Sequence, residues 1–233
     1  MCYNAQMSAA FFLTGIAVTL YIVLYNQTLT ERHVPMLLLF YSAMELLQTI
    51  QYSYVNQCGD RVNAVLTEIA YVLVIVQPLL WNAFFYLNSA TSSCDRRLFV
   101  LGGTFAVVWI CVNVLARLRH SMTALAPSAE PQTKSHSFFA GDATCTRKRN
   151  SHLYWEWTSD NFKDLTANYL MYLMIWFIPP LLTQAHRLPI LLVGAFALLG
   201  VAMAWYAGEP EIFASAWCYI SVPMVLVFMF AYN

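Results

Sequence analysis

The sequence predicts an all-α integral membrane protein, folded as a single domain of seven transmembrane helices over residues 1–233. Its composition is the first reason: 60% of the 233 residues are hydrophobic and only 10% are charged, against about 25% charged residues in ordinary soluble domains. The second reason is length, because a span takes about 20 apolar residues. Seven runs are long enough, at residues 8–25, 34–55, 66–87, 97–116, 167–185, 188–206 and 211–232.

The connections between these predicted spans are brief except for one. Residues 117–166 form a long polar loop between the fourth and fifth spans, and this loop holds most of the charge. Its first part is rich in Pro and Ser, which is typical of a flexible connection. Its later part, HLYWEWTSD, carries Tyr154, Trp155 and Trp157, and aromatic residues of this kind favour an element lying at headgroup depth over an eighth span.

Charge gives little information about partners beyond the bilayer itself. Twelve Lys and Arg balance twelve Asp and Glu, so no nucleic-acid partner is expected, and no feature identifies a protein partner. The N-terminal stretch lacks the basic region and the cleavage site of a secretory signal, so the first span should remain as an anchor. Basic residues in the loops after the first, third and fifth spans favour an N-terminus outside the membrane.

The second predicted span contains a carboxylate near its middle. Glu45 lies eleven residues after Val34, which is roughly 16 Å into a hydrocarbon layer about 30 Å thick. A carboxylate at that depth costs about 3 kcal/mol on the lenient insertion scale, so it should face a protein interior or a wet cavity. Three polar residues at helical spacing share the face of Glu45, namely Tyr41, Gln48 and Tyr52. Gln51 is offset from that face.

The third predicted span adds Gln77 and Asn82, on opposite sides of an ideal helix. Gln77 lies eleven residues after Leu66, at about the depth of Glu45, so we expect these two side chains to be in contact. Buried Gln and Asn side chains also serve as hydrogen-bonding links between helices. Glu45 is less well explained in that way, because a glutamine would link helices without titrating.

Three cysteines should lie at one end of the bundle, because the N-terminus, the loop after the second span and the long loop all fall on the same side of the membrane. They are Cys2, Cys58 and Cys145. A disulfide, a small thiolate–imidazole metal site with His152, and unrelated thiols are all compatible with this placement, and their spacing matches no zinc pattern. We therefore expect no bound metal.

The long loop could cap the polar pocket with His152, Trp155 and Glu156. His152 and Glu156 could also form an acid–base pair above the membrane. Other enzyme features are missing: no GxSxG, HExxH or phosphate-binding loop is present, and no histidine lies deep in a span. All three lysines lie in or beside the long loop, so the chain is not a retinal protein. No cofactor is expected.

Several short stretches also carry a resemblance. They are Met1-Cys2, MELLQTIQYSYVNQC ending at Cys58, Asn63 with LTEIAYVLVIVQP after it, His152-x-x-Trp155, the proline-containing end of the fifth span, and Glu211 followed further on by AWCYIS. Together they resemble a family of small seven-helix membrane proteins of unknown function with bacterial and large-virus members. The resemblance implies the architecture and the membrane location, and it supplies no activity, ligand or catalytic residue. The chain departs from it where a histidine is expected in the third span, near Tyr71.

These observations lead to three hypotheses about function. The first is that the protein binds or translocates a small polar solute or a proton through a polar pocket between the second and third spans, with Glu45 as proton acceptor, Gln48 and Gln77 orienting the ligand, and Tyr41 and Tyr52 as walls. The second is a structural or accessory membrane subunit without transport activity. The third is a lipid-modifying membrane enzyme that uses His152 and Glu156.

Overall fold

The computed structural model describes residues 4–89, 93–123, 140–141, 144–149, 152–158, 169–183, 187–206 and 220–227. Its helices are α1 (Ala5–Tyr25), α2 (Gln27–Glu31), α3 (Val34–Gln51), α4 (Arg61–Asn88), α5 (Ser93–Thr123), α6 (Tyr169–Leu182) and α7 (Arg187–Tyr206), with a further helical segment at residues 220–227. Its strands are β1 (Ala140–Gly141), β2 (Cys145–Arg149) and β3 (His152–Thr158).

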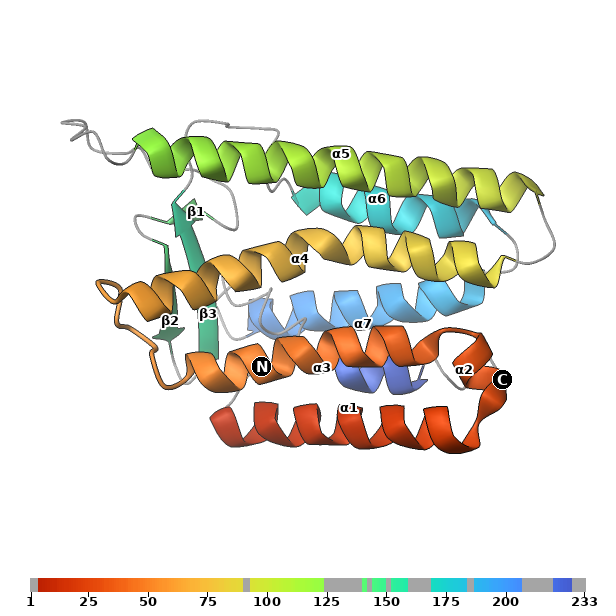
Figure 1. The fold of residues 1–233 in the computed structure, drawn as a ribbon, viewed down its shortest axis with the longest axis horizontal. Coiled ribbons are helices and arrows are strands. Elements are labelled where there is room, and N and C mark those ends of the chain that lie inside the picture. Colours follow the sequence, from red (N-terminus) through yellow and green to blue (C-terminus); the bar gives the residue numbers. More distant parts are fainter. Residues whose placement is uncertain are drawn as a thin grey trace.

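The long helices lie side by side along one direction, and the strands cross one end of them (Figure 1). This is the end at which α3 stops and α4 begins, whereas the short helix α2 lies at the opposite end. Strand β3 is central in the small sheet, with β2 antiparallel to it on one side and β1 parallel on the other. We call β2 and β3 the hairpin.

Three helices are long and apolar enough to cross a membrane, at Ala5–Tyr25, Arg61–Asn88 and Cys94–Leu115. Two shorter apolar helical stretches lie at Met171–Leu182 and Leu188–Gly200. The predicted second span is helical over Val34–Gln51 and lies outside this group. Of the predicted seventh span, 211–232, the structure describes residues 220–227, and these are helical.

The expectation of an all-α chain was wrong at the predicted long loop. Helix α5 continues to Thr123, and part of the segment expected at headgroup depth forms strand β3. The sequence carried a signal for this strand, since Leu153, Trp155 and Trp157 are buried while the residues between them are half-buried. Apolar residues at every second position indicate a strand with one face against a core.

Local sequence features set the ends of the helices. Asn4 caps α1, and its side chain accepts a hydrogen bond from the backbone N–H of Met7 (2.9 Å). Asp60 caps α4 in the same way, accepting from the backbone N–H of Val62 (3.0 Å), as N-cap residues do. Helix α3 ends at Gln51, four residues before the predicted boundary. The turn that follows contains Asn56 at φ 64°, a left-handed conformation that asparagine tolerates.

Small residues allow two close approaches between helices. A Cβ atom on Gly15 of α1 would lie 2.0 Å from the Ser42 hydroxyl oxygen of α3. A Cβ atom on Gly102 of α5 would lie 2.2 Å from Oδ1 of Asn82 in α4 and 2.8 Å from Cγ of Pro179 in α6. At Gly102 an added Cβ atom would also meet the Pro179 ring, whereas at Gly15 it would require the Ser42 hydroxyl to rotate, so the approach of α5 to α4 and α6 is the tighter of the two.

We predict that Gly102→Ala destabilises the protein by about 1–3 kcal/mol, the range for overpacking a filled interior. The neighbouring Gly103→Ala is the matched control, because a Cβ atom there would meet its nearest neighbour, Leu79 Cδ1, at an ordinary 3.9 Å. Thermal unfolding in detergent micelles, followed by circular dichroism, measures both. Equal unfolding temperatures for the two variants would show that the contact at Gly102 is not tight.

Candidate functional site

The Glu45 side chain is fully buried, with 0% of its surface exposed. The hydroxyl of Ser8 in α1 is the side-chain group that interacts with its carboxyl. Neither carboxyl oxygen has a partner at hydrogen-bonding geometry within the described part of the chain. A buried carboxyl whose oxygens lack a hydrogen-bond partner is costly, so Glu45 is a poorly satisfied polar group among the described residues.

The surroundings of Glu45 belong to the contact between α1 and α3. Ser8 and Ser42 are buried there, and their hydroxyl oxygens also lack a hydrogen-bond partner in the described residues. Ser42 packs against Gly15, one helical turn from Glu45 along α3. Sequence reasoning missed both serines, although small polar residues in apolar helices are typical of helix–helix contacts in membranes.

Gln77 has other partners than the one expected from the sequence. Its amide N–H donates to the sulfur of Met44 (3.1 Å), and its carbonyl oxygen accepts from the Tyr172 hydroxyl of α6. The carboxyl of Glu45 makes no hydrogen bond with Gln77. Neighbouring residues on a helix differ by about 100° in direction, so Met44 reaches toward α4 while Glu45 is turned to α1.

Two of the other polar residues expected at the pocket, Asn82 and Tyr41, hydrogen-bond to neighbouring helices. Asn82 Nδ2 donates to the Pro78 carbonyl (2.8 Å) and to the Ile175 carbonyl of α6 (2.9 Å). The Tyr41 hydroxyl accepts from Nε1 of Trp81 in α4 (2.8 Å). Gln48 is buried and Tyr52 is half-buried. Tyr41 and Gln48 are therefore the buried residues of this expected set at helical spacing from Glu45, whereas Gln51 is turned about 120° away from it.

Gln51 connects α3 to the hairpin. Its amide N–H groups donate to the Leu66 carbonyl (3.0 Å) and to Thr146 Oγ1 (3.1 Å), and its carbonyl oxygen accepts from Nε1 of Trp155 (3.0 Å). The sequence placed Gln51 at the edge of the polar face and Trp155 in the loop cap, without joining them. The contact brings together residues 104 positions apart, which no local pattern could show.

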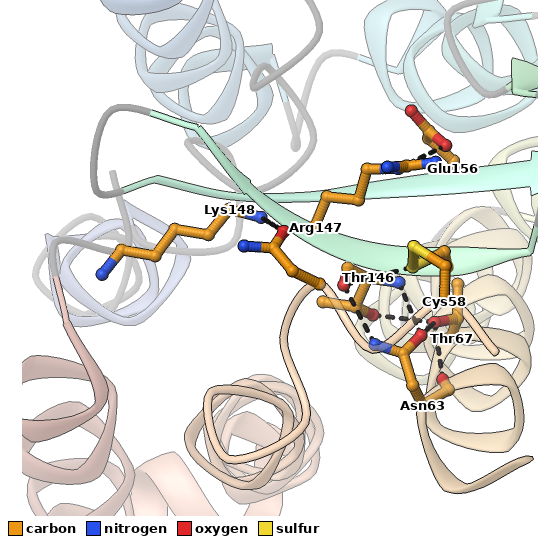
Figure 2. A network of polar contacts seen from close by, with 9 residues as sticks. Cys58, Asn63, Thr67, Thr146, Arg147, Lys148 and Glu156 are labelled. Atoms are coloured by element: carbon orange, nitrogen blue, oxygen red, sulfur yellow. Dashed lines mark hydrogen bonds and ion pairs between the residues drawn. A yellow bond between two sulfur atoms is a disulfide. The ribbon is translucent and has the colours of Figure 1, made fainter. Parts of the chain in front are cut away.

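Thr146 fixes β2 to the start of α4 (Figure 2). Its backbone N–H donates to Asn63 Oδ1 (2.9 Å), and its carbonyl accepts from Asn63 Nδ2 (3.0 Å). Its hydroxyl lies 2.8 Å from that of Thr67, and Trp157 Nε1 donates to the Thr67 carbonyl (2.9 Å). Thr146 was not singled out from the sequence, because an isolated threonine in a polar segment carries no signal.

A disulfide joins Cys58, in the turn before α4, to Cys145 at the start of β2. The sequence left three arrangements open for the cysteines, and for Cys58 and Cys145 the structure has the disulfide. Cys2 lies outside the described residues. Cys94 and Cys111 are free. No cluster of three or more His, Cys, Asp or Glu side chains occurs in the ranges described above.

The acid–base pair expected at the loop cap between His152 and Glu156 stays a prediction. The Glu156 carboxylate accepts from Nε of Arg147 on the neighbouring strand (2.8 Å), in a partly exposed ion pair (Figure 2). The side chain of His152 lies outside the described residues. Glu156 is thus held by a cation of the hairpin, in an arrangement that stabilises surface strands modestly.

Comparison with known proteins places the chain in a family. The model of a family of unknown function, DUF5765, matches residues 6–232. The chain belongs to this family. An uncharacterized protein of Acanthamoeba polyphaga mimivirus, R287, is 23% identical over 232 residues, covering 95% of this chain and 91% of that protein. A family of unknown function and a large-virus relative, as the resemblance implied, are thereby confirmed. No solved structure matches the chain.

We predict that the double variant Cys58→Ser/Cys145→Ser loses about 2–4 kcal/mol of stability, because the disulfide closes a loop with a sequence separation of 87 residues. Cys111→Ser is the control, since that thiol is free on α5. Thermal unfolding with and without reductant tests this. Reductant should lower the unfolding temperature of the wild type and leave that of the double variant unchanged; equal values throughout would contradict the prediction.

Proposed function

We propose that the protein is an integral membrane protein of seven spans that binds a proton at Glu45, and that this proton site serves binding or movement of a proton or a small polar solute. The observation that carries the proposal is the fully buried carboxyl whose two oxygens have no hydrogen-bond partner in the described residues. Without a partner, a neutral protonated carboxyl is the form that burial tolerates best.

The surface and the layout of the helices support the membrane location. Large apolar side chains are exposed on α1, α5 and α7, among them Leu13, Phe105 and Leu198. Exposed apolar surface on this scale is unusual for a monomer in water and suits contact with lipid. The three helices of membrane-spanning length lie alongside the shorter α3, α6 and α7 in one bundle (Figure 1), as spans of one membrane domain would.

The disulfide supports an orientation. Structural disulfides persist in oxidising compartments and are rare in the cytosol, so we place the hairpin end of the bundle on the external or luminal side. Asn4, at the start of α1, lies at the same end as the turn before α4 (Figure 1). This agrees with the external N-terminus that the loop charges favour.

A second candidate function is a structural or accessory membrane subunit. The paired polar groups favour it, because Gln77, Asn82 and Tyr41 each hydrogen-bond between helices. Such bonds link spans without any chemistry. Glu45 distinguishes the two candidates, since a glutamine would link helices equally well and neither of its carboxyl oxygens is at hydrogen-bonding geometry to another described residue.

We predict that the purified protein in lipid nanodiscs shows the infrared C=O band of a protonated carboxyl at neutral pH, and that Glu45→Gln removes it. Glu31→Gln is the control, because Glu31 is exposed on α2 and hydrogen-bonds to Gln27. Glu45→Gln should also abolish any wild-type proton flux in proteoliposomes loaded with a pH-sensitive dye. If the band persists in Glu45→Gln, the proton site is not there and the accessory role is favoured.

The orientation is tested by labelling with a membrane-impermeant maleimide in intact cells. The background has Cys2, Cys94, Cys111 and Cys218 changed to serine. In it, Lys148→Cys should react from outside, because Lys148 is an exposed residue of β2. Thr28→Cys, exposed on α2 at the other end, should react only after permeabilisation. The reverse pattern would invert the proposed orientation.

A further inference from the structure

Two neighbouring arginines, Arg96 and Arg97, are exposed near the start of α5. Helix α4 ends just before them, at Asn88 with Ser89 as its C-cap. The end of α4, the start of α5 and the short helix α2 lie at one end of the bundle, opposite the hairpin (Figure 1). The two cations therefore belong to the end of the molecule that the polar contacts of the hairpin do not reach.

Contacts with the end of α4 hold the Arg96 side chain in place. Its Nε donates to the Ser89 carbonyl (3.1 Å), and its Cζ lies 5.6 Å from the centre of the Tyr86 ring, within the range of a cation–π contact. These contacts fix the direction of the guanidinium, whose terminal Nη groups can still donate to a ligand. A cation ordered in advance loses less conformational entropy on binding than a freely moving one.

The acidic residues at this end do not neutralise the two arginines. Glu31 accepts from the Gln27 amide on its own helix (2.8 Å), and Asp95 is half-buried. Within the described residues, neither acid forms an ion pair with Arg96 or Arg97. The two guanidinium groups are therefore open to an anion from outside the chain.

An exposed apolar stripe runs along α5 from Arg97. Its members, which are 55%, 65% and 56% exposed, are Leu101, Phe105 and Val108. They follow Arg97 at intervals of four, four and three residues, so they lie on the same face of the helix as that arginine. The stripe belongs to a helix of membrane-spanning length, Cys94–Leu115. A cation followed by an apolar stripe fits a phospholipid, in which the phosphate is joined to acyl chains in the same order.

Exposed tyrosines surround this end of the bundle. Tyr86 is exposed near the end of α4, and Tyr21 and Tyr25 are exposed near the end of α1, which lies at the same end (Figure 1). Tyrosine and tryptophan are enriched where a membrane meets water. The position of these rings therefore places Arg96 and Arg97 at the depth of lipid headgroups.

We propose that an acidic phospholipid binds at this end, with its phosphate on the Arg96 guanidinium, Arg97 beside it, and an acyl chain along the stripe. The inference rests on the proposed membrane location and is independent of the proton site at Glu45. Guanidinium groups bind phosphate oxygens in a bidentate manner. A zwitterionic lipid carries the same phosphate with a cation attached, which two arginines repel, so the site selects acidic lipids.

The test is native mass spectrometry of the full-length protein in a neutral detergent, with equal amounts of phosphatidylglycerol and phosphatidylcholine added. The wild type should bind phosphatidylglycerol in preference. Arg96→Gln should weaken this binding roughly tenfold, the effect of losing one charge-assisted hydrogen bond. Arg61→Gln is the matched control, because it removes the same charge from an exposed arginine at the hairpin end of α4, and it should leave the preference unchanged.

Two further variants separate a built site from a general attraction of charge. Arg96→Lys keeps the charge without the planar fork, so it should restore only part of the binding. Arg97→Gln should weaken binding roughly fivefold, the effect of one cation near an acidic headgroup. This second variant also covers the case in which Arg96→Gln fails to fold, and circular dichroism checks the helical content of each protein.

No preference for phosphatidylglycerol in the wild type, or equal weakening in Arg96→Gln and Arg61→Gln, would overturn the proposal. Excess inorganic phosphate should leave the lipid bound, because the stripe holds an acyl chain; displacement by phosphate would show a site for a free anion instead. Glu45→Gln should bind the lipid as the wild type does. A protein that stays in solution without detergent would refute the membrane location itself, so that failure is distinguishable from failure of the lipid site.

Discussion

A carboxyl group inside a bundle of apolar helices needs a hydrogen-bond partner, a counter-ion or a proton. The structure around Glu45 offers Ser8 as a neighbour but no hydrogen bond to either carboxyl oxygen in the residues that it describes. The close approach of α1 to α3 at Gly15 and Ser42 closes this region tightly. The packing that gives the bundle its dense interior thus also encloses its buried acid, and the proposed proton site depends on that constraint.

Two other polar side chains of the interior have hydrogen-bond partners on neighbouring helices. Gln77 is held between Met44 and Tyr172, and Asn82 binds two carbonyl groups with its amide nitrogen. Backbone and side-chain groups in lipid must find partners within the protein, and these residues supply them at the contacts of α3, α4 and α6. These amides therefore contribute to the contacts between helices, whereas Glu45 lies at a different contact, that of α1 with α3.

The hairpin end shows how a small sheet is built onto helices. A buried amide group, Asn63, pairs with both backbone groups of Thr146, 83 positions further along the chain. The disulfide ties the same strand to the turn before α4. Asn56 adds a third connection, accepting from the Lys148 backbone N–H (2.9 Å). A strand edge held in this way has few free backbone groups, which limits pairing with other chains.

The sequence by itself determined the helical, apolar character of the chain, the approximate position of its helices and the presence of an acid deep in one of them. These features depend on composition, on the length of apolar runs and on helical periodicity, which are local. It also contained the alternation in Leu153, Trp155 and Trp157 that indicates a strand. Tertiary structure alone decided that Glu45 faces Ser8 of α1 and not Gln77 of α4, and that Cys58, Gln51 and Asn63 meet the hairpin. The direction of a side chain around a helix bundle depends on which helices become neighbours, and that choice is made by packing over the whole chain.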